Sequence, residues 1–442
     1  MAKMTYAGVE WMKAAWGTPL QSGLRFGAQA MRSNPLAMAM GGRELAALWD
    51  VAGRLAKHYE KPLWREDEWG YPVEIKKIWG TPFGNLIRFK QPGAEERPKL
   101  LIVAPMSGHY PTLLRQTVKE MGHAHDVFLT EWINPRDVPL SDGDFSLDSY
   151  VDFLRQSMRE LAALDARPAH AMSVCQPTVP MLAAASLMWE DKEAAAPASL
   201  VMIGGPIDAR LSPTATNNFA LKHPIEWFES TLINWVPSPH AGAGRKVYPG
   251  FLQHMGFVAM NPSRHAKAHR QYFRDLLGGE EAAAEKHRAF YDEYNAVMDL
   301  AAPYYLETVK KVFQDFDLPQ GRLMACGRLV KPEAVKGFLM TIEGELDDIS
   351  GAGQTHSAQR LCSGIASGSR EERTFEGVGH YGVFSGSSFV ESVAPAIGAF
   401  IQKCEAELIS PSKPAAKDSE QGKQKAPRKA AKATAAKTPP QA

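Results

Sequence analysis

Cys175 is the residue whose type and position in this chain are best suited to covalent chemistry. It ends an apolar run, Ala169 to Val174, and precedes a helix-like run that begins at Thr178. A nucleophile on such a sharp strand-to-helix turn stands exposed at the end of a sheet. A cysteine thiol ordinarily has a pKa of about 8.5, and a helix N-terminus or an imidazole lowers such a pKa and favours the attacking thiolate. The pattern predicts a thiol esterase.

Two further segments supply the groups that a thiol nucleophile needs. An acidic loop containing Asp347 and Asp348 follows one predicted strand, and His380 follows the last one in a Gly-Val-Gly-His-Tyr-Gly segment. Hydrolases with this nucleophile turn have the chain order nucleophile, acid, histidine. We expect His380 to deprotonate Cys175 and then protonate the leaving alkoxide, while one of the two aspartates fixes the imidazole tautomer. A lone free cysteine is usually a small buried hydrophobe, but these ordered partners favour catalysis.

The oxyanion formed by attack on an ester needs two backbone N–H donors. The first is expected from Gln176, directly after the nucleophile, and the second from the loop after Pro105, at Met106. His109 lies in the same loop. Its position favours a role in supporting this loop or contacting the substrate over a role as general base.

The segments around these residues alternate between apolar strands and helices. Continuous apolar runs, typical of buried parallel strands, are accompanied by two earlier strand-like pieces. The strand-like segments are residues 73–79, 86–89, 99–105, 126–130, 169–174, 199–203, 338–342 and 373–375, and helical runs include 148–164 and 178–189. This alternation predicts an α/β-hydrolase fold, with a mostly parallel sheet flanked by helices and a ligand crevice at the carboxyl ends of the strands.

The chain is expected to divide into five segments. These are an amphipathic Trp- and Met-rich leader (1–65), a first part of the core (66–208), a helical cap insertion (209–331), a second part of the core (332–408) and a basic tail (409–442). In the leader, apolar residues recur at three- and four-residue spacing from Leu45 to Tyr59. This apolar face is expected to pack on the main domain or to dock on a partner. The Lys-, Ala- and Pro-rich tail is expected to be disordered.

Composition places the chain among ordinary globular proteins. It has 442 residues, 45% of them hydrophobic and 22% charged, with a formal net charge of +1. There is no unbroken apolar run of about 18 residues and no secretory pattern, so neither a membrane span nor export is expected. The cysteines Cys175, Cys326, Cys362 and Cys404 are far apart in sequence. Their spacing indicates a reducing, cytoplasmic compartment and no metal site.

Several motifs together resemble those of the intracellular polyhydroxybutyrate (polyhydroxyalkanoate) depolymerases, which are cysteine-type α/β-hydrolases. The matching segments are Ala-Pro-Met-Ser-Gly-His at 104–109, Thr-Leu-Leu-Arg at 112–115, Ser-Val-Cys-Gln-Pro at 173–177, the acidic loop at 343–349 and the histidine segment at 377–382. The resemblance runs from the leader to about Glu405 and excludes the tail. It implies cleavage of amorphous poly(3-hydroxybutyrate) in storage granules, with a triad of Cys175, Asp347 and His380. Asp348 is the alternative candidate for the acid.

The resemblance does not determine whether water or coenzyme A accepts the acyl group. Water would release hydroxybutyrate monomers or oligomers, whereas coenzyme A would release an acyl thioester, and no other cofactor is expected. The expected partner is the granule surface. No specific nucleic acid is expected, although the basic tail is suited to an anionic partner, and a homo-oligomer is left open.

Two other functions fit parts of the pattern. A polyester synthase can use the same thiol, aspartate and histidine, but its nucleophile turn resembles G-x-C-x-G, and Ser173 and Pro177 replace both glycines here. A non-catalytic granule-coating protein would use the amphipathic leader and the basic tail. Such a protein has no need of three reactive groups in catalytic order, so it is the weakest of the three hypotheses.

Overall fold

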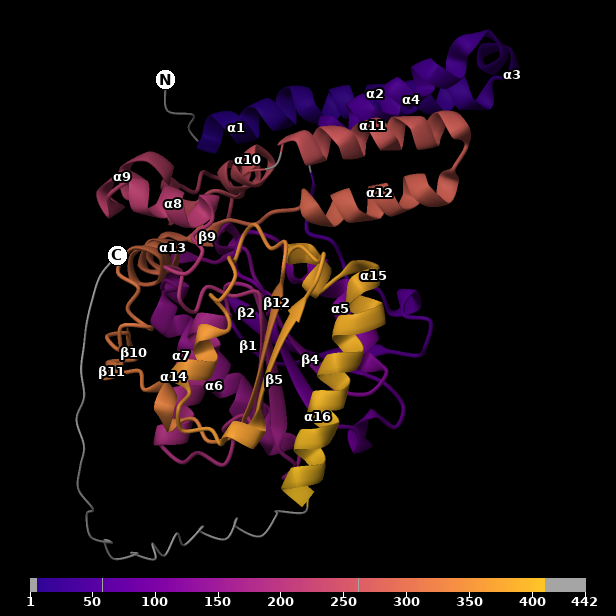
Figure 1. Ribbon diagram of the computed structural model, residues 1–442. Helices are drawn as coiled ribbons and strands as arrows, with labels where there is room; N and C mark the ends of the chain where they lie inside the picture. Colours follow the sequence, from indigo (N-terminus) through magenta and orange to yellow (C-terminus); the bar gives the residue numbers. More distant parts are fainter. Residues whose placement is uncertain (1–5, 58, 261, 410–442) are drawn as a thin grey trace, which may run out of the picture.

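An eight-stranded, mostly parallel sheet forms the centre of the molecule. The computed structural model describes residues 6–57, 59–260 and 262–409 (Figure 1). The strand order is β1-β2-β4-β3-β5-β6-β12-β13, and only the pairs β1–β2 and β2–β4 are antiparallel. The strands are β1 (Glu74–Thr81), β2 (Gly84–Lys90), β3 (Lys99–Val103), β4 (Asp126–Trp132), β5 (Ala169–Val174), β6 (Ser199–Ile203), β12 (Phe338–Gly344) and β13 (Arg370–Phe375). The predicted α/β-hydrolase fold is confirmed.

Helices cover both faces of this sheet, and this burial explains why its central strands are apolar. On one face lie α5 (Arg115–Gly122) and α16 (Ala394–Ile409), and on the other lie α6 (Leu147–Leu164) and α7 (Thr178–Glu190) (Figure 1). Strands β3, β4, β5, β6 and β12 are buried at every residue, so they have continuous apolar runs. Helix α7 is buried on all sides from Thr178 to Met188 and is therefore apolar all round.

The last strand is longer than its sequence indicated. The apolar pattern predicted residues 373–375, whereas β13 begins at Arg370 and has the sequence Arg-Glu-Glu-Arg-Thr-Phe. It pairs only with β12 and so forms an edge of the sheet. Charged side chains are common on edge strands because they discourage pairing with another chain. The edge position accounts for the missing apolar signal.

The inserted cap lies over the carboxyl ends of the parallel strands (Figure 1). Its helices are α8 (Ala215–Lys222), α9 (Ile225–Leu232), α10 (Gly250–Met260), α11 (Pro262–Gly278), α12 (Glu281–Tyr294) and α13 (Ala302–Thr308). It also contains a small sheet of β7 (Asn234–Trp235), β8 (Lys246–Tyr248) and β9 (Leu300–Ala301), and a hairpin of β10 (Met324–Ala325) and β11 (Arg328–Leu329). The insertion is mainly helical, and its short strands lie in its aromatic-rich first part and near its end.

Helix α12 ends earlier than its apolar pattern indicated. The sequence pattern of residues 282–298 predicts a helix over this whole range, but α12 stops at Tyr294. The following residues turn toward the core, where Val297 forms a β-bridge with His109 and the N–H of Met298 donates to the carbonyl of Gly108 at 2.7 Å. A tertiary backbone pairing thus replaces the last helical turn.

The leader is more helical than expected and packs on the cap. It forms α1 (Tyr6–Met12), α2 (Thr18–Ser33), the short α3 (Pro35–Ala37) and α4 (Arg43–Leu55), and α2 and α4 lie side by side above α11 (Figure 1). The glycines and prolines after Trp16 predict a broken stretch, but Pro19 lies in the first turn of α2, where proline is tolerated.

Specific polar contacts fix the leader in place. The Tyr6 hydroxyl donates to Asp299 at 2.8 Å, the Tyr272 hydroxyl to Asp50 at 2.6 Å, and Arg54 donates to Asp292 at 2.7 Å. Several large apolar side chains nevertheless face outward. Trp11, Trp16, Phe26, Leu36, Met40 and Leu48 are all more than half exposed. The leader therefore packs on the cap with one face and presents apolar groups on another.

The C-terminal segment is the longest apolar helical stretch in the described part of the chain. Residues 380–409 would be long and apolar enough to cross a membrane by length and composition alone. Ile397, Phe400, Ile401 and Cys404 of α16 are buried in the main core, and core helices pass the same test. Helix α16 includes Ile409, the first residue of the predicted disordered tail. The rest of that tail, residues 410–442, lies outside the described residues.

Candidate active site

Cys175 occupies a strained turn at the carboxyl end of β5. Its φ of 68° lies in the left-handed region, which is rare for residues other than glycine. The turn is held by a hydrogen bond from the Cys175 N–H to the Ile203 carbonyl at 2.7 Å and by one from the Thr178 N–H to the Cys175 carbonyl at 3.2 Å. The half-buried thiol therefore stands at the N-terminus of α7. Strain of this kind is typical of a nucleophile turn.

The acid and the histidine lie on loops that follow β12 and β13. His380 Nδ1 and Asp347 Oδ2 are 2.7 Å apart, and both side chains are almost fully buried. The other oxygen of Asp347 accepts hydrogen bonds from the N–H groups of Ile349 and Ser350. This turn aims the carboxylate at the imidazole. The structure thus brings Asp347 to His380, whereas Asp348 lines a neighbouring cavity.

His380 is electrostatically coupled to both Cys175 and Asp347. Burial lowers the pKa of the imidazole, but the charges on Cys175 and Asp347 and the hydrogen bonds to both raise it. The net result is a pKa well above the ordinary value for histidine. The arrangement favours a protonated imidazole beside the Cys175 thiol, and a neighbouring imidazolium is the usual means of activating a cysteine nucleophile.

Two glycines after β6, which were not identified from sequence, leave room for the triad. Gly204 has a φ of +54°, and a Cβ there would lie 3.3 Å from both Asp347 Oδ2 and His380 Cε1. A Cβ on Gly205 would collide with Thr178 at the start of α7. The Gly-Gly pair directly after a predicted strand was the available signal, because such glycines often mark a close backbone approach.

The loop that contains Met106 is fixed by hydrogen bonds from aromatic side chains. Trp132 Nε1 donates to the carbonyl of Ala104 at 2.9 Å, as does the Tyr150 hydroxyl at 3.1 Å, and the Tyr304 hydroxyl donates to the carbonyl of Met106 at 3.1 Å. Both tyrosines come from distant helices and were not identified from sequence. Burial raises their pKa well above the ordinary value, so both hydroxyls stay protonated as donors.

The two expected oxyanion donors are free to bind a ligand. Met106 and Gln176 are buried, and within the described part of the chain neither backbone N–H has a hydrogen-bond acceptor. Buried N–H groups without an acceptor are rare in folded proteins. Their availability at this end of the sheet is the property that an oxyanion hole requires.

His109 lies between the oxyanion loop and the cap. Its ring stacks on Phe257 of α10 with a centroid distance of 4.6 Å and lies 5.1 Å from the ring of Tyr294 on α12. Burial lowers the pKa of His109 to about 4, so the ring is neutral near pH 7. This placement fits support of the loop, one of the two roles that we expected.

Replacing His109 tests this supporting role. We expect His109→Ala to lower kcat/KM for p-nitrophenyl butyrate about tenfold, because the oxyanion loop loses the ring contacts with Phe257 and Tyr294 that help to hold it against the cap. His109→Phe, which keeps an aromatic ring, should recover most of the activity. The shape of the pH–rate profile should stay the same in both variants, because His109 carries no proton that titrates between pH 6 and 9. Loss of an ionisation from that profile would instead assign His109 to proton transfer.

No metal site accompanies these groups in the part of the chain that the structure describes. Within it, no three His, Cys, Asp or Glu side chains are placed to hold a metal ion.

Comparison with known proteins identifies one related family. A family model described as the C-terminus of PHB de-polymerase matches residues 204–405. The matched segment contains Asp347 and His380, together with Gly204, and begins after Cys175. It supports the resemblance to polyhydroxybutyrate depolymerases over this part of the chain. No curated protein matches the sequence.

Solved structures with a similar fold are distant in sequence. A hydrolase from Pseudomonas aeruginosa PA01 is 15% identical, with 75% of this chain and 98% of that chain covered and a TM-score of 0.41. Est1E from Butyrivibrio proteoclasticus is 12% identical, with 75% and 99% covered and a TM-score of 0.40. A monoacylglycerol lipase from Paleococcus ferrophilus is 10% identical, with 70% and 96% covered and a TM-score of 0.39.

Proposed function

We propose that this chain is an intracellular depolymerase that cleaves the ester bonds of amorphous poly(3-hydroxybutyrate) through an acyl-cysteine intermediate. One observation carries the proposal: the segment that matches the PHB depolymerase family contains the Asp347–His380 pair, which is coupled to a thiol on a nucleophile turn. Ester hydrolysis is supported by the family match. The polyester substrate and the cysteine mechanism are the further steps of the proposal.

The residues suggest the following course of reaction. The Cys175 thiolate attacks an ester carbonyl, and the N–H groups of Met106 and Gln176 stabilise the resulting oxyanion. His380 protonates the alkoxide as the C–O bond breaks, which releases one piece of the chain as an alcohol and leaves the other as a thioester on Cys175. His380 then accepts a proton from the acceptor, which attacks the thioester and frees the thiol. Asp347 holds the imidazole in the required orientation throughout.

The acceptor in the second step is water or the thiol of coenzyme A. Water yields a free hydroxyacid end, whereas coenzyme A yields a hydroxyacyl thioester, and the thiolate at Cys175 leaves in both cases. We propose the cytoplasm as the location of the enzyme and the granule surface as its partner. The exposed apolar groups of the leader, including Trp11, Trp16 and Phe26, are suited to contact with a water-insoluble polyester.

Native amorphous granules provide the direct test. Purified enzyme should release soluble hydroxybutyrate products from them in the absence of coenzyme A if water is the acceptor. If coenzyme A is the acceptor, products should form only when it is added, and their mass should include the coenzyme. Granules without enzyme and granules with a Cys175→Ala variant serve as controls. Binding to granules without release of either product would contradict the proposal and favour a coating protein.

A further inference from the structure

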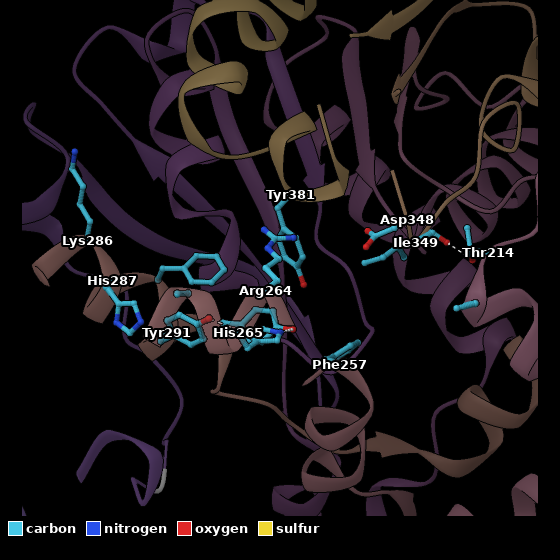
Figure 2. Close-up of a pocket in the computed structure, with 14 residues that line it drawn as sticks. Thr214, Phe257, Arg264, His265, Lys286, His287, Tyr291, Asp348, Ile349 and Tyr381 are labelled. Carbon is cyan, nitrogen blue, oxygen red and sulfur yellow. Dashed lines mark hydrogen bonds between the residues drawn. The ribbon is translucent and has the colours of Figure 1, made fainter. Parts of the chain in front are cut away.

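A cavity beside the triad loops has a chemical character that a neutral polyester does not explain. Its volume is about 730 Å³, and it lies between the cap helices α11 and α12 and the loops that follow β12 and β13 (Figure 2). This size is typical of a site for a small ligand. Cys175 and His380 do not line it, so it is adjacent to the reacting groups and distinct from them.

Two residues connect this cavity directly to the active site. Asp348 and Tyr381 line it, and each follows a triad residue in sequence. Burial raises the pKa of Tyr381 well above the ordinary value, and the charge on Cys175 adds to this effect, so the Tyr381 hydroxyl lies within electrostatic range of the thiol. The rings of Tyr381 and His380 have a centroid distance of 5.9 Å, so the cavity lies next to the imidazole of the triad.

The wall of the cavity is aromatic and carries two cations. Its aromatic residues are Phe257, Phe290, Tyr291, Tyr294 and Tyr381. Arg264 and Lys286 supply positive charge, and Asp348 supplies the one carboxylate among the lining residues. His265 and His287 also line it, but burial lowers the pKa of both, that of His287 to about 4, so they add no charge near pH 7.

Arg264 is the cation best placed to meet a ligand. Figure 2 shows its guanidinium beside the ring of Tyr381, and the two are 5.7 Å apart. Within the described residues no carboxylate pairs with Arg264, whereas Arg288 on the facing helix is bonded to Glu281 and Glu285. In the view of Figure 2, Lys286 and Asp348 lie on opposite sides of Arg264.

We propose that this cavity binds the carboxylate end of a hydroxyacid chain and that Arg264 is the residue that recognises it. The inference rests on the proposed function. A poly(hydroxybutyrate) chain has neutral ester groups along its length, and its single charged group is the terminal carboxylate. Arginine forms bidentate, charge-assisted hydrogen bonds with carboxylates, so a guanidinium beside Tyr381 that has no carboxylate partner among the described residues selects that end. The enzyme then favours short oligomers and chain ends over interior bonds.

The test compares a hydroxybutyrate trimer that has a free carboxylate with the methyl ester of the same trimer. Loss of one charge-assisted contact typically changes affinity about tenfold to hundredfold. Wild-type kcat/KM should therefore be about tenfold or more higher for the acid than for the methyl ester. Arg264→Gln should bring this ratio close to one, mainly through KM for the acid, and Arg264→Lys should keep part of the preference.

A second arginine on the same helix provides the matched control. Arg270 is exposed on α11 and does not line the cavity, so Arg270→Gln should retain the wild-type preference. Equal cleavage of acid and methyl ester by the wild type, or an equal loss of preference in both variants, would overturn the inference while leaving the depolymerase proposal intact. If neither trimer nor granules are cleaved, the proposed function itself fails.

Discussion

Replacing Cys175 with alanine is expected to reduce ester cleavage by about 10⁴-fold or more, the largest effect of any single substitution in this chain. Removing a covalent nucleophile leaves only the oxyanion donors and substrate binding to stabilise the transition state, and such remnants retain a small part of the total rate enhancement. The loss should be seen with p-nitrophenyl butyrate and with amorphous granules alike. Retention of the native rate on either substrate would exclude the acyl-cysteine mechanism.

Cys326 is the matched control for this experiment. It is also partly exposed, and its Sγ lies 3.2 Å from Asp152, far from the triad in the fold. Burial and Asp152 raise the pKa of Cys326 to about 12, so its thiol is unreactive at neutral pH. Cys326→Ala should retain activity.

Chemical modification gives an independent measurement of the same assignment. Iodoacetamide should add one alkyl group at Cys175 in parallel with the loss of activity, because Cys362 and Cys404 are buried and burial raises the pKa of both to about 12. Peptide mass analysis identifies the labelled residue. Labelling of another cysteine, with full loss of activity, would contradict the assignment of Cys175.

The second large effect is expected for Asp347→Asn, with a loss of about 10²- to 10⁴-fold in kcat. Asparagine keeps the size of the side chain but can present an amide donor to His380 Nδ1, which favours the wrong imidazole tautomer. Asp348→Asn should cause a far smaller loss, because the structure places Asp347 on the imidazole at 2.7 Å. A greater loss for Asp348→Asn would reverse the assignment of the acid.

The pH dependence of Asp347→Asn provides a further readout with a defined sign. The charge and hydrogen bond of Asp347 raise the pKa of His380, so their removal lowers that pKa. Above the pKa, the imidazolium that protonates the leaving alkoxide is lost, and the rate falls. The alkaline limb of the pH–rate profile should therefore move to lower pH in Asp347→Asn. If the alkaline limb of the pH–rate profile stays at the wild-type pH, a group other than His380 controls that limb.

The parts of this protein that could be predicted from sequence are those with local signals. Buried parallel strands have continuous apolar runs, so β3, β5, β6 and β12 could be located and the fold class followed from their alternation with helices. The edge strand β13 gave only a partial signal, because its exposed face favours charged residues. The end of α12 was missed because a backbone pairing with the His109 loop interrupts a periodic helix pattern.

The active site likewise has features that could be predicted from sequence and features that depend on the tertiary structure. Sequence alone determined the order of thiol, acid and histidine and placed each after a strand, because the turn chemistry of a nucleophile and the ends of strands are local properties. Only the tertiary structure decided that Asp347 and not Asp348 meets His380, that Gly204 leaves room for this pair, and that Arg264 of the cap lies beside the ring of Tyr381. These facts depend on distances between segments far apart in the chain, and such distances are set by the packing of the sheet and cap.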